Sequence, residues 1–329
     1  MPGVFNDEEA TSLLRERFAP KIVDQIFQSN PLFKTLYEGR STFDGGRTLS
    51  HPVMYEGDIE GEGGEFDVSD ETFSTETADA FNVSSFRWKA YQFPIKIHEI
   101  EIAEFGNSDA RAINLLAARS QRAAMALSSR LGKHLFKEAG VGPKQIHSLN
   151  DAFAQANVYG GIDRSQASNS WWQTKQQEMH ATTATALTLR KVHDTIEDCS
   201  EGAIRPTFGI TDLATYSKIW DLALTNQRYG DTRRTVFLGF PAIEVDGVPI
   251  IRMKQADNDG SDGANTKRKI RFLNTDFWEF STHSAYDFFV RPFRLVGNDG
   301  VVWVARIFWM GNVYTTAPRY NGELINILA

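Results

Sequence analysis

The feature that most constrains the fold is a long helical pattern over residues 108–140. Apolar and small residues recur there at three- and four-residue steps, which is typical of one face of a helix. Many alanines raise the intrinsic helicity, Ser108 can cap the start, and Gly140 supplies a stop. At 1.5 Å per residue this helix would span roughly 48 Å. The residues on its apolar side are Ile113, Ala117, Ser120, Ala124, Leu127, Leu131 and Leu135.

The opposite face of this helix is basic. Six cations stand against two acids, Asp109 and Glu138. The cations are Arg111, Arg119, Arg122, Arg130, Lys133 and Lys137.

A long β-hairpin with an acidic tip is predicted before the helix. Strand-like stretches at residues 47–57 and 81–97 flank a Gly-rich segment with few core residues. Residues 42–86 hold eleven acids and a single base, Arg47. This segment is either a solvated flexible loop or an extension that lies on another subunit. The acids singled out for an intersubunit contact are Glu56, Asp58, Glu60, Glu62, Glu65, Asp67, Asp70 and Glu71.

The N-terminal region, residues 7–40, is predicted to form short helices interrupted by Pro20 and Pro31. A narrow apolar stripe on a short helix cannot fold alone, so this arm needs a partner surface. The apolar residues expected to make that contact are Leu13, Leu14, Phe18, Ile22, Ile26 and Phe27.

The second half of the chain mixes helices and strands. Helices are predicted over 188–202 and 210–230, the latter capped by Thr211 or Asp212. Residues 240–254 predict a hairpin that turns at Asp246-Gly247. Residues 270–328 are mostly strand, and 301–316 are so apolar that both faces of that strand should be buried.

Composition narrows the classes of function. The net charge of −7 is unlike that of a protein that grips DNA phosphates directly. No apolar run is long enough to cross a membrane, and the acidic start does not resemble a signal peptide, so synthesis in the cytoplasm is expected. A single cysteine, Cys199, predicts a small buried side chain without a disulfide partner.

The chain lacks the spacing of known catalytic and cofactor motifs. There is no phosphate-binding GxxxxGK[ST] loop, no GxGxxG after a strand, no GxSxG and no HExxH. The acidic loop around Asp257, Asp259 and Asp262 fails the calcium-loop pattern, because Arg268 stands where Glu is required. We therefore expect no enzyme activity, no catalytic residue, no cofactor and no metal site.

Three local sequences and their order carry a resemblance to a known family. GGRTLSHPVMYEG (residues 45–57), NVYGGIDRSQASNSWW (157–172) and VARIFWMGNVYTTAPRYNGELINI (304–327) are similar to stretches in the major capsid proteins of tailed bacteriophages. The order of arm, long hairpin, spine-like helix, mixed lobe and closing strands also resembles the Hong Kong 97 capsid fold. The resemblance covers essentially the whole chain.

That resemblance implies an α+β fold with named parts. Residues 1–40 would be the N-terminal arm, 41–94 the extended E-loop, 95–145 and 268–329 the peripheral P-domain, and 146–267 the axial A-domain. The expected function is a structural protein that assembles into hexamers and pentamers of an icosahedral head enclosing double-stranded DNA. An encapsulin-like cellular compartment is the nearest alternative, and a soluble α/β enzyme with an unrecognised site is a remote one.

The resemblance also implies partners and departures. Other copies of the chain, a portal protein at one vertex and a decoration protein are expected partners, with packaged DNA nearby but not specifically bound and with no membrane. The type member of the fold cross-links its E-loop through lysine, but no lysine lies between Lys34 and Lys89 here, so non-covalent assembly is expected. The type member also has a long N-terminal scaffolding segment, whereas this chain starts close to the arm, so a separate scaffolding protein is expected. The virion, assembled in the host cytoplasm, is the expected location.

Charge suggests how neighbouring subunits recognise each other. In the fold that the chain resembles, the E-loop lies across the P-domain of a neighbour. The acidic segment would then bind the basic face of the helix at residues 108–140 in the next subunit. Single exposed ion pairs contribute only about 0–1 kcal/mol each, so a network of them would set register rather than strength.

Overall fold

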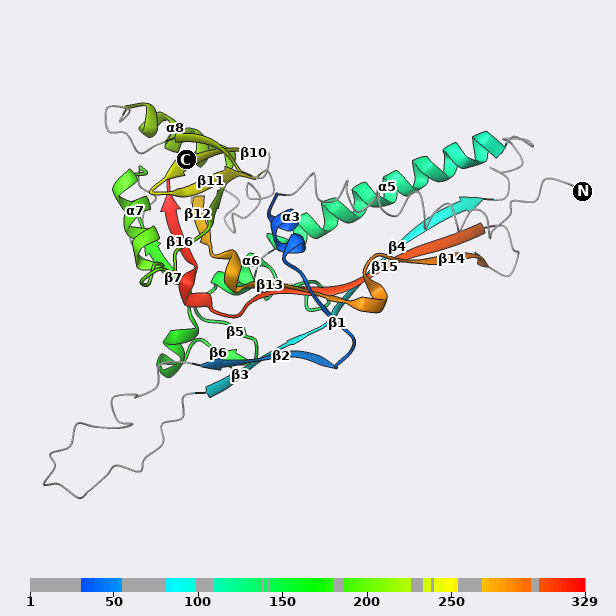
Figure 1. Ribbon diagram of the computed structural model, residues 1–329, viewed down its shortest axis with the longest axis horizontal. Helices are drawn as coiled ribbons and strands as arrows, with labels where there is room; N and C mark the ends of the chain where they lie inside the picture. The colour runs from blue at the N-terminus through cyan, green and yellow to red at the C-terminus, as the bar shows by residue number, and fades with distance from the viewer. Residues whose placement is uncertain are drawn as a thin grey trace, which may run out of the picture.

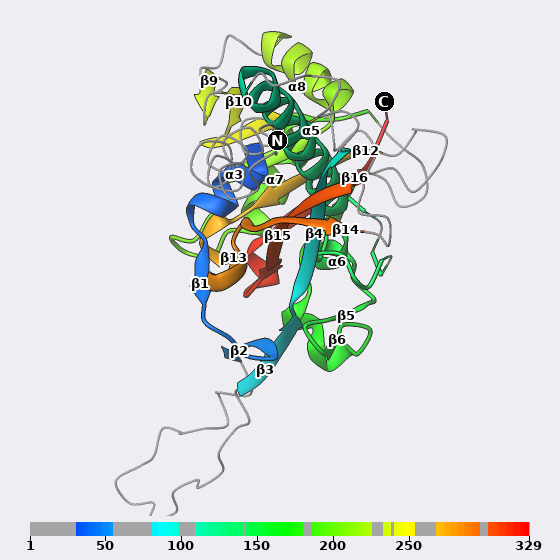
Figure 2. The ribbon, with the colours of Figure 1, turned by 90° about the vertical axis from the view of Figure 1, so that its right-hand side faces the viewer.

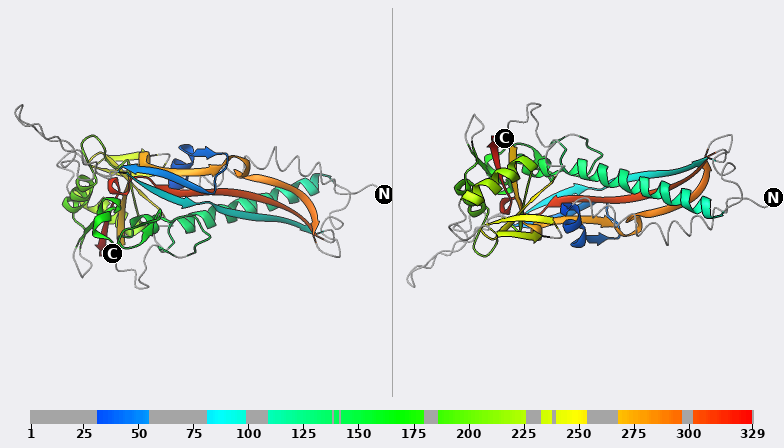
Figure 3. Two further views of the ribbon diagram at one scale, coloured as in Figure 1. Left: turned by 90° about the horizontal axis from the view of Figure 1, so that it is seen from below. Right: turned by 90° about the horizontal axis from the view of Figure 1, so that it is seen from above.

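Two β-sheets follow one another along the long axis of the molecule, and a long helix lies beside one of them (Figure 1). The computed structural model describes residues 31–54, 81–98, 109–137, 139–140, 142–179, 186–225, 233–237, 240–253, 268–296 and 302–328. Views from above and below show the elongated outline, with the seven-stranded sheet at one end and the long strands reaching the other (Figure 3).

The five-stranded sheet is built around β15 (Val302–Thr315). The strand β4 (Lys89–His98) pairs antiparallel with β15 along its entire length. On the other edge of β15, β14 (Phe289–Val296) pairs with its first half and β13 (Trp278–His283) with its last residues. The short strand β1 (Ser41–Phe43) adds to β13 in parallel. The last five residues of β15, 311–315, are buried on both faces as predicted, whereas its first part largely alternates between buried and half-buried residues.

The long helix α5 (Asp109–Leu135) packs on β4 with the predicted apolar stripe. Leu127, Leu131 and Leu135 are buried. Its end was predicted wrongly at Gly140, because the helix stops at Leu135. Just past this end, the carbonyls of Phe136 and Lys137 accept hydrogen bonds from the side-chain amide of Asn150 at 3.4 and 2.9 Å, which holds the chain where it leaves the helix.

The helix α3 (Pro31–Glu38) begins at a proline, the residue that suits the first helical turn. Its Leu32, Phe33 and Leu36 are buried against the body of the same chain. Phe33 meets Phe280 of β13 edge to face, with ring centroids 5.0 Å apart. This last part of the predicted arm therefore finds its partner surface within its own subunit.

The predicted hairpin is present. Strands β2 (Thr48–Met54) and β3 (Phe81–Arg87) pair antiparallel, and β3 leads into β4 after a one-residue break at Trp88. The hairpin projects from the body below the five-stranded sheet, as the side view also shows (Figure 1, Figure 2).

A seven-stranded sheet forms the second lobe, with α7 (Leu189–Asp198) and α8 (Leu213–Thr225) packed on it. Both predicted helices are confirmed, and both have side-chain caps at the start: Thr188 for α7, and Asp212 for α8 through the amides of Ala214 and Thr215. The sheet order is β7 (Lys175–Glu178), β16 (Gly322–Ile327), β12 (Arg268–Leu273), β8 (Phe208–Thr211), β11 (Val248–Arg252), β10 (Phe240–Val245) and β9 (Arg233–Phe237).

The predicted hairpin of β10 and β11 is confirmed together with its turn. Asp246 and Gly247 have φ of 52° and 77°, the left-handed values of a two-residue turn that matches the twist of the strands.

A compact connection joins α5 to the second lobe. It contains α6 (Leu149–Phe153), the two-residue strands β5 (Val158–Tyr159) and β6 (Ile162–Asp163), and a 3₁₀ helix at Ala167–Trp172. Arg164 is fully buried here and donates from Nη1 to the carbonyls of Ala152 and Ala154 at 2.5 and 2.9 Å. Further 3₁₀ turns occur at Thr275–Phe277, Ser284–Tyr286 and Pro318–Tyr320.

The sheets divide the chain differently from the predicted domains at two places. β12 and β16 belong to the seven-stranded sheet, although residues 268–329 were assigned to the P-domain. Residues 89–94, assigned to the hairpin extension, are part of β4 and hence of the five-stranded sheet. Among the described residues, no helix is long and apolar enough to span a membrane.

Candidate intersubunit surfaces

One face of the β2–β3 hairpin is apolar and open to solvent. Met54, Phe81 and Val83 are 73%, 68% and 57% exposed. Met54 lies directly across from Phe81, and Pro52 across from Val83, so these four side chains share one face of the hairpin. Large exposed apolar side chains gathered on one face are typical of a protein–protein contact.

The opposite face of the hairpin anchors it to the body. Leu49 and Phe86 are buried there. Phe86 contacts Tyr159 and His147 edge to face, with ring centroids 5.1 and 5.4 Å apart. The hairpin is therefore held firmly at its base, while its apolar face remains free.

Polar contacts reinforce this anchor. The Nε2 atom of His51 lies 2.5 Å from the hydroxyl of Tyr314 and 3.3 Å from a carboxylate oxygen of Glu279. The Tyr314 hydroxyl donates to the same Glu279 oxygen at 2.8 Å. Burial raises the pKa of Tyr314 well above its ordinary range, so this hydroxyl stays protonated and remains a donor.

Two sets of predicted contact residues lie outside the described residues. One is the acidic set of the hairpin tip: Glu56, Asp58, Glu60, Glu62, Glu65, Asp67, Asp70 and Glu71. The other is the apolar set of the arm: Leu13, Leu14, Phe18, Ile22, Ile26 and Phe27. Their roles stay predictions.

The predicted basic set on the long helix is only partly available to a neighbour. Arg122, Arg130 and Lys133 are exposed on α5. Lys137 lies beyond the helix end, where its Nζ donates to the carbonyl of Gly142 at 3.2 Å and approaches Asp151 at 3.8 Å. Arg119 is half-buried, and Arg111 lies on the helix with a side chain outside the described set.

A second basic surface, which the sequence reasoning missed, lies on the five-stranded sheet. Lys96 of β4, Arg291 and Arg294 of β14, and Arg306 of β15 all occupy its face turned away from α5. A signal was present in the sequence, since these three strands contain no acidic residue. The cations become neighbours only through the strand register.

The single cysteine is a packing residue, as predicted. Cys199 is 1% exposed, and its thiol donates to the carbonyl of Thr195 at 2.9 Å. A Cβ atom placed on Gly322 would come within 2.0 Å of the sulfur, which shows how closely β16 approaches it. Burial raises the pKa of the Cys199 thiol to about 12, so it is not a reactive thiolate near neutral pH.

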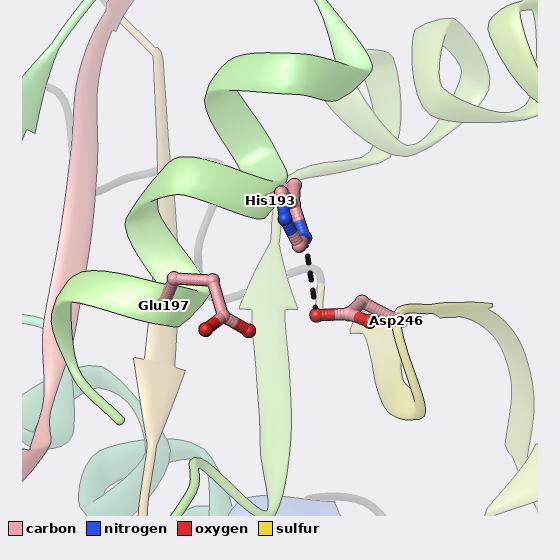
Figure 4. Close-up of side chains that lie close together, drawn as sticks. All are labelled: His193, Glu197 and Asp246. Atoms are coloured by element: carbon pink, nitrogen blue, oxygen red, sulfur yellow. Dashed lines mark hydrogen bonds and ion pairs between the residues drawn. The ribbon is translucent and has the colours of Figure 1, made fainter. Parts of the chain in front are cut away.

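One cluster of potential metal ligands occurs on the second lobe. His193 and Glu197, one turn apart on α7, face Asp246 of the β10–β11 turn (Figure 4). His193 Nδ1 lies 3.1 Å from Asp246. Arg205 pairs with both Glu197 and Asp246, so a guanidinium already neutralises these carboxylates. His193 and Glu197 are exposed and Asp246 is half-buried, so the arrangement is that of a surface ion-pair network.

Comparison with known proteins supplies the decisive observation about the fold. No protein-family model and no curated protein sequence matches the chain. Among solved structures, the capsid of cyanophage A-1(L) superimposes with a TM-score of 0.62 at 13% identity, covering 90% of this chain and 92% of that one. The chain has the Hong Kong 97-type capsid fold.

Other solved structures with this Hong Kong 97-type fold include both a second phage capsid and an encapsulin. The capsid of Myoviridae phage XM1 matches with a TM-score of 0.53 at 12% identity over 88% of this chain and 90% of that one. The encapsulin complex from Synechococcus elongatus PCC 7942 matches with a TM-score of 0.54 at 12% identity over 88% and 84%. The Hong Kong 97-type fold is therefore shared with both kinds of shell, and the structure has the predicted α+β content.

Proposed function

We propose that this chain is the major capsid protein of a tailed bacteriophage. Copies would form hexamers and pentamers that close into an icosahedral head around double-stranded DNA. The observation that carries this proposal is the likeness to a phage capsid over nine-tenths of both chains.

The surfaces described above support a role in self-association. The exposed apolar face around Met54, Phe81 and Val83 lies on a hairpin that projects from the body. Burying this face in a neighbour would gain roughly 25 cal/mol for each Å² of apolar surface removed from water. In this proposal β2 and β3 are the base of the E-loop, α5 is the spine helix, and the seven-stranded sheet is the A-domain.

Further partners belong to the same proposal. A separate scaffolding protein, a portal at one vertex and a decoration protein would complete the particle, which assembles in the host cytoplasm. Contacts between copies would be non-covalent. The net charge of −7 suits a shell that encloses DNA without holding it tightly.

An encapsulin-like compartment is the second candidate, and the likeness to the Synechococcus shell favours it specifically. Sedimentation velocity with light scattering on the purified chain tests shell formation in both cases. Masses of capsomers or closed particles are expected, and a stable monomer or dimer would overturn both proposals. Nuclease-protected DNA in particles taken from the producing cells would favour the phage head, and protein cargo without DNA would favour the compartment.

A further inference from the structure

The solvent side of the long helix α5 carries positive charge without negative charge to balance it. Asp109, the first residue of α5, is the one acid in the helix, and five lysines and arginines follow it. Arg122, Arg130 and Lys133 are exposed. Among the residues that the structure describes, no acid forms an ion pair with any of these three cations. Their charge is therefore available to a partner.

These cations lie along one ridge of the helix. At 3.6 residues per turn, Arg122 and Lys133 point within about 20° of each other and lie about 16 Å apart along the helix axis. Ser129 is exposed between them on the same ridge. The other exposed residues beside them include the small Ala118 and Ala126. Because the ridge is low between the cations, their long side chains can reach the surface of a partner.

The end of α5 is a region of positive potential. The guanidinium carbon of Arg130 lies 5.5 Å from the ring centroid of Phe93, beside the ridge. His134 is half-buried one turn further on, and burial is the largest cause that lowers its pKa. The positive charges of Lys137 and Arg130 lower the pKa of His134 further. An anion that binds here would meet a field that already favours negative charge.

The composition of the ridge indicates a partner that is recognised by charge. Among the described side chains of α5, Met125 is the one large apolar side chain that is exposed. The β2–β3 hairpin, in contrast, gathers Met54, Phe81 and Val83 on one open face. The hairpin projects from the side of the body opposite α5 (Figure 1, Figure 2). The side with the hairpin therefore suits apolar contacts with other subunits, and the side with α5 suits a polyanion.

Double-stranded DNA is the polyanion that the proposed function places beside this chain. It carries one negative charge for about each 1.7 Å of its axis, so several phosphates fit within the length of the ridge. Lysine, arginine and serine side chains all contact phosphate oxygens, and such contacts carry no sequence information. A few cations on each copy, repeated over a shell, would contact the DNA at many points while each contact stays weak.

We propose that the solvent ridge of α5, formed by Arg122, Ser129 and Lys133 with Arg130 beside it, contacts the phosphate backbone of the enclosed DNA. This inference rests on the proposed function and names the part of the chain that meets the genome. The contact is independent of base sequence and weakens as salt rises. The net charge of −7 of the whole chain limits how tightly the DNA is held.

Formaldehyde cross-linking of particles taken from the producing cells tests which face of the chain meets DNA. Formaldehyde joins lysine amines to nucleobases in close contact. Lys133 on α5 and Lys96 on the sheet face turned away from α5 are both exposed, so each reports on one face. After digestion with nuclease and protease, mass spectrometry should find nucleotide adducts on Lys133 and not on Lys96.

Adducts on Lys96 without any on Lys133 would overturn the proposal, as would the lack of adducts on both in particles that contain DNA. Particles that contain no DNA are a different result, because they contradict the phage-head function itself.

Binding of a short fluorescent DNA duplex of mixed sequence to the unassembled full-length chain gives an independent result. Anisotropy measured at several salt concentrations gives the slope of log association constant against log salt. Three phosphate contacts predict a slope of about −3. Arg122→Gln with Lys133→Gln should change the slope to about −1 with an unchanged circular dichroism spectrum, because two contacts are lost and glutamine is a good helix former.

The matched control, Arg291→Gln with Arg294→Gln on the sheet, should keep the slope of the wild type. If the control variant lost the salt dependence and the helix variant kept it, the sheet and not α5 would be the DNA-binding face. Lack of duplex binding by the wild-type chain at low salt would also contradict the proposal.

Discussion

The ring of Phe86 stacks on the ring of Tyr314, with centroids 4.4 Å apart and planes inclined by 14°. This contact joins the projecting hairpin to the central strand β15. Gly160, with φ of 62°, lies so close that a Cβ atom there would come within 2.9 Å of the Phe86 ring. The hairpin is thus built onto the core through an aromatic cluster, and its position relative to the sheet is set by packing.

Two phenylalanines on the same strand should behave in opposite ways. Phe86 is 1% exposed and Phe81 is 68% exposed. Phe86→Ala should lower the free energy of unfolding by about 3–5 kcal/mol, because it leaves a cavity in the aromatic cluster. Phe81→Ala should change it by less than about 0.5 kcal/mol yet reduce association of subunits. Urea unfolding of the unassembled chain and light scattering measure the two effects. Equal destabilisation by both changes would contradict this division of the hairpin.

Arg164 is predicted to act through its flat guanidinium, which lies over an aromatic ring, as well as through its charge. The guanidinium lies 4.4 Å from the ring centroid of Tyr159 and holds the two carbonyls near the end of α6. Burial lowers the pKa of Arg164 to about 10, which still leaves it charged at neutral pH. Arg164→Lys should therefore destabilise the chain by about 2 kcal/mol or more, since lysine cannot both stack and bridge. If the Arg164→Lys variant unfolded at the same temperature as the wild type, any cation at this position would be enough for stability.

Stability is predicted to fall as the solution becomes mildly acidic, through His147. Burial is the largest cause that holds the pKa of His147 below its ordinary value of 6.5. The folded chain then binds fewer protons than the unfolded chain, so the free energy of unfolding decreases as pH falls from about 6.5 toward the folded pKa. His147→Gln should flatten this dependence between pH 7 and pH 5, with any constant loss from the Asn312 contact visible at both. Parallel curves for wild type and variant would assign the pH dependence to other groups.

Particles should dissolve into single chains under denaturing conditions. No lysine lies between Lys34 and Lys89, so the hairpin offers no amine for an amide bond to a neighbouring asparagine. A denaturing gel of purified particles should show one band at the mass of the monomer. A ladder of multiples that survives boiling and reducing agent would show covalent links between subunits.

Local signals in the sequence predicted most of the elements. The Asp246-Gly247 turn, the Asp212 cap and the strands of the hairpin depend on neighbours within a few residues, and each is confirmed. The predicted end of the long helix was wrong because it depends on a residue that is distant in sequence. Asn150, which holds the carbonyls just past the helix end, lies 13 residues after Lys137, and no local pattern identifies it.

Long-range register explains what the sequence did not predict. β12 and β16 lie in the same strand-rich stretch of sequence as the other closing strands, and only pairing with β8 and β7 places them in the seven-stranded sheet. Likewise, Lys96 and Arg294 come from opposite halves of the chain and flank Val304 only after β4 and β14 have paired with β15. The sequence predicted a basic surface on the long helix, and not on the sheet, because the cations of the helix are close together in sequence.

Electron microscopy of the purified chain, alone and with a candidate scaffolding protein, tests the central claim most directly. The proposed function predicts closed icosahedral shells or rings with five- and six-fold symmetry. A monodisperse monomer or dimer under every condition would contradict the claim that this Hong Kong 97-type fold serves to build a shell.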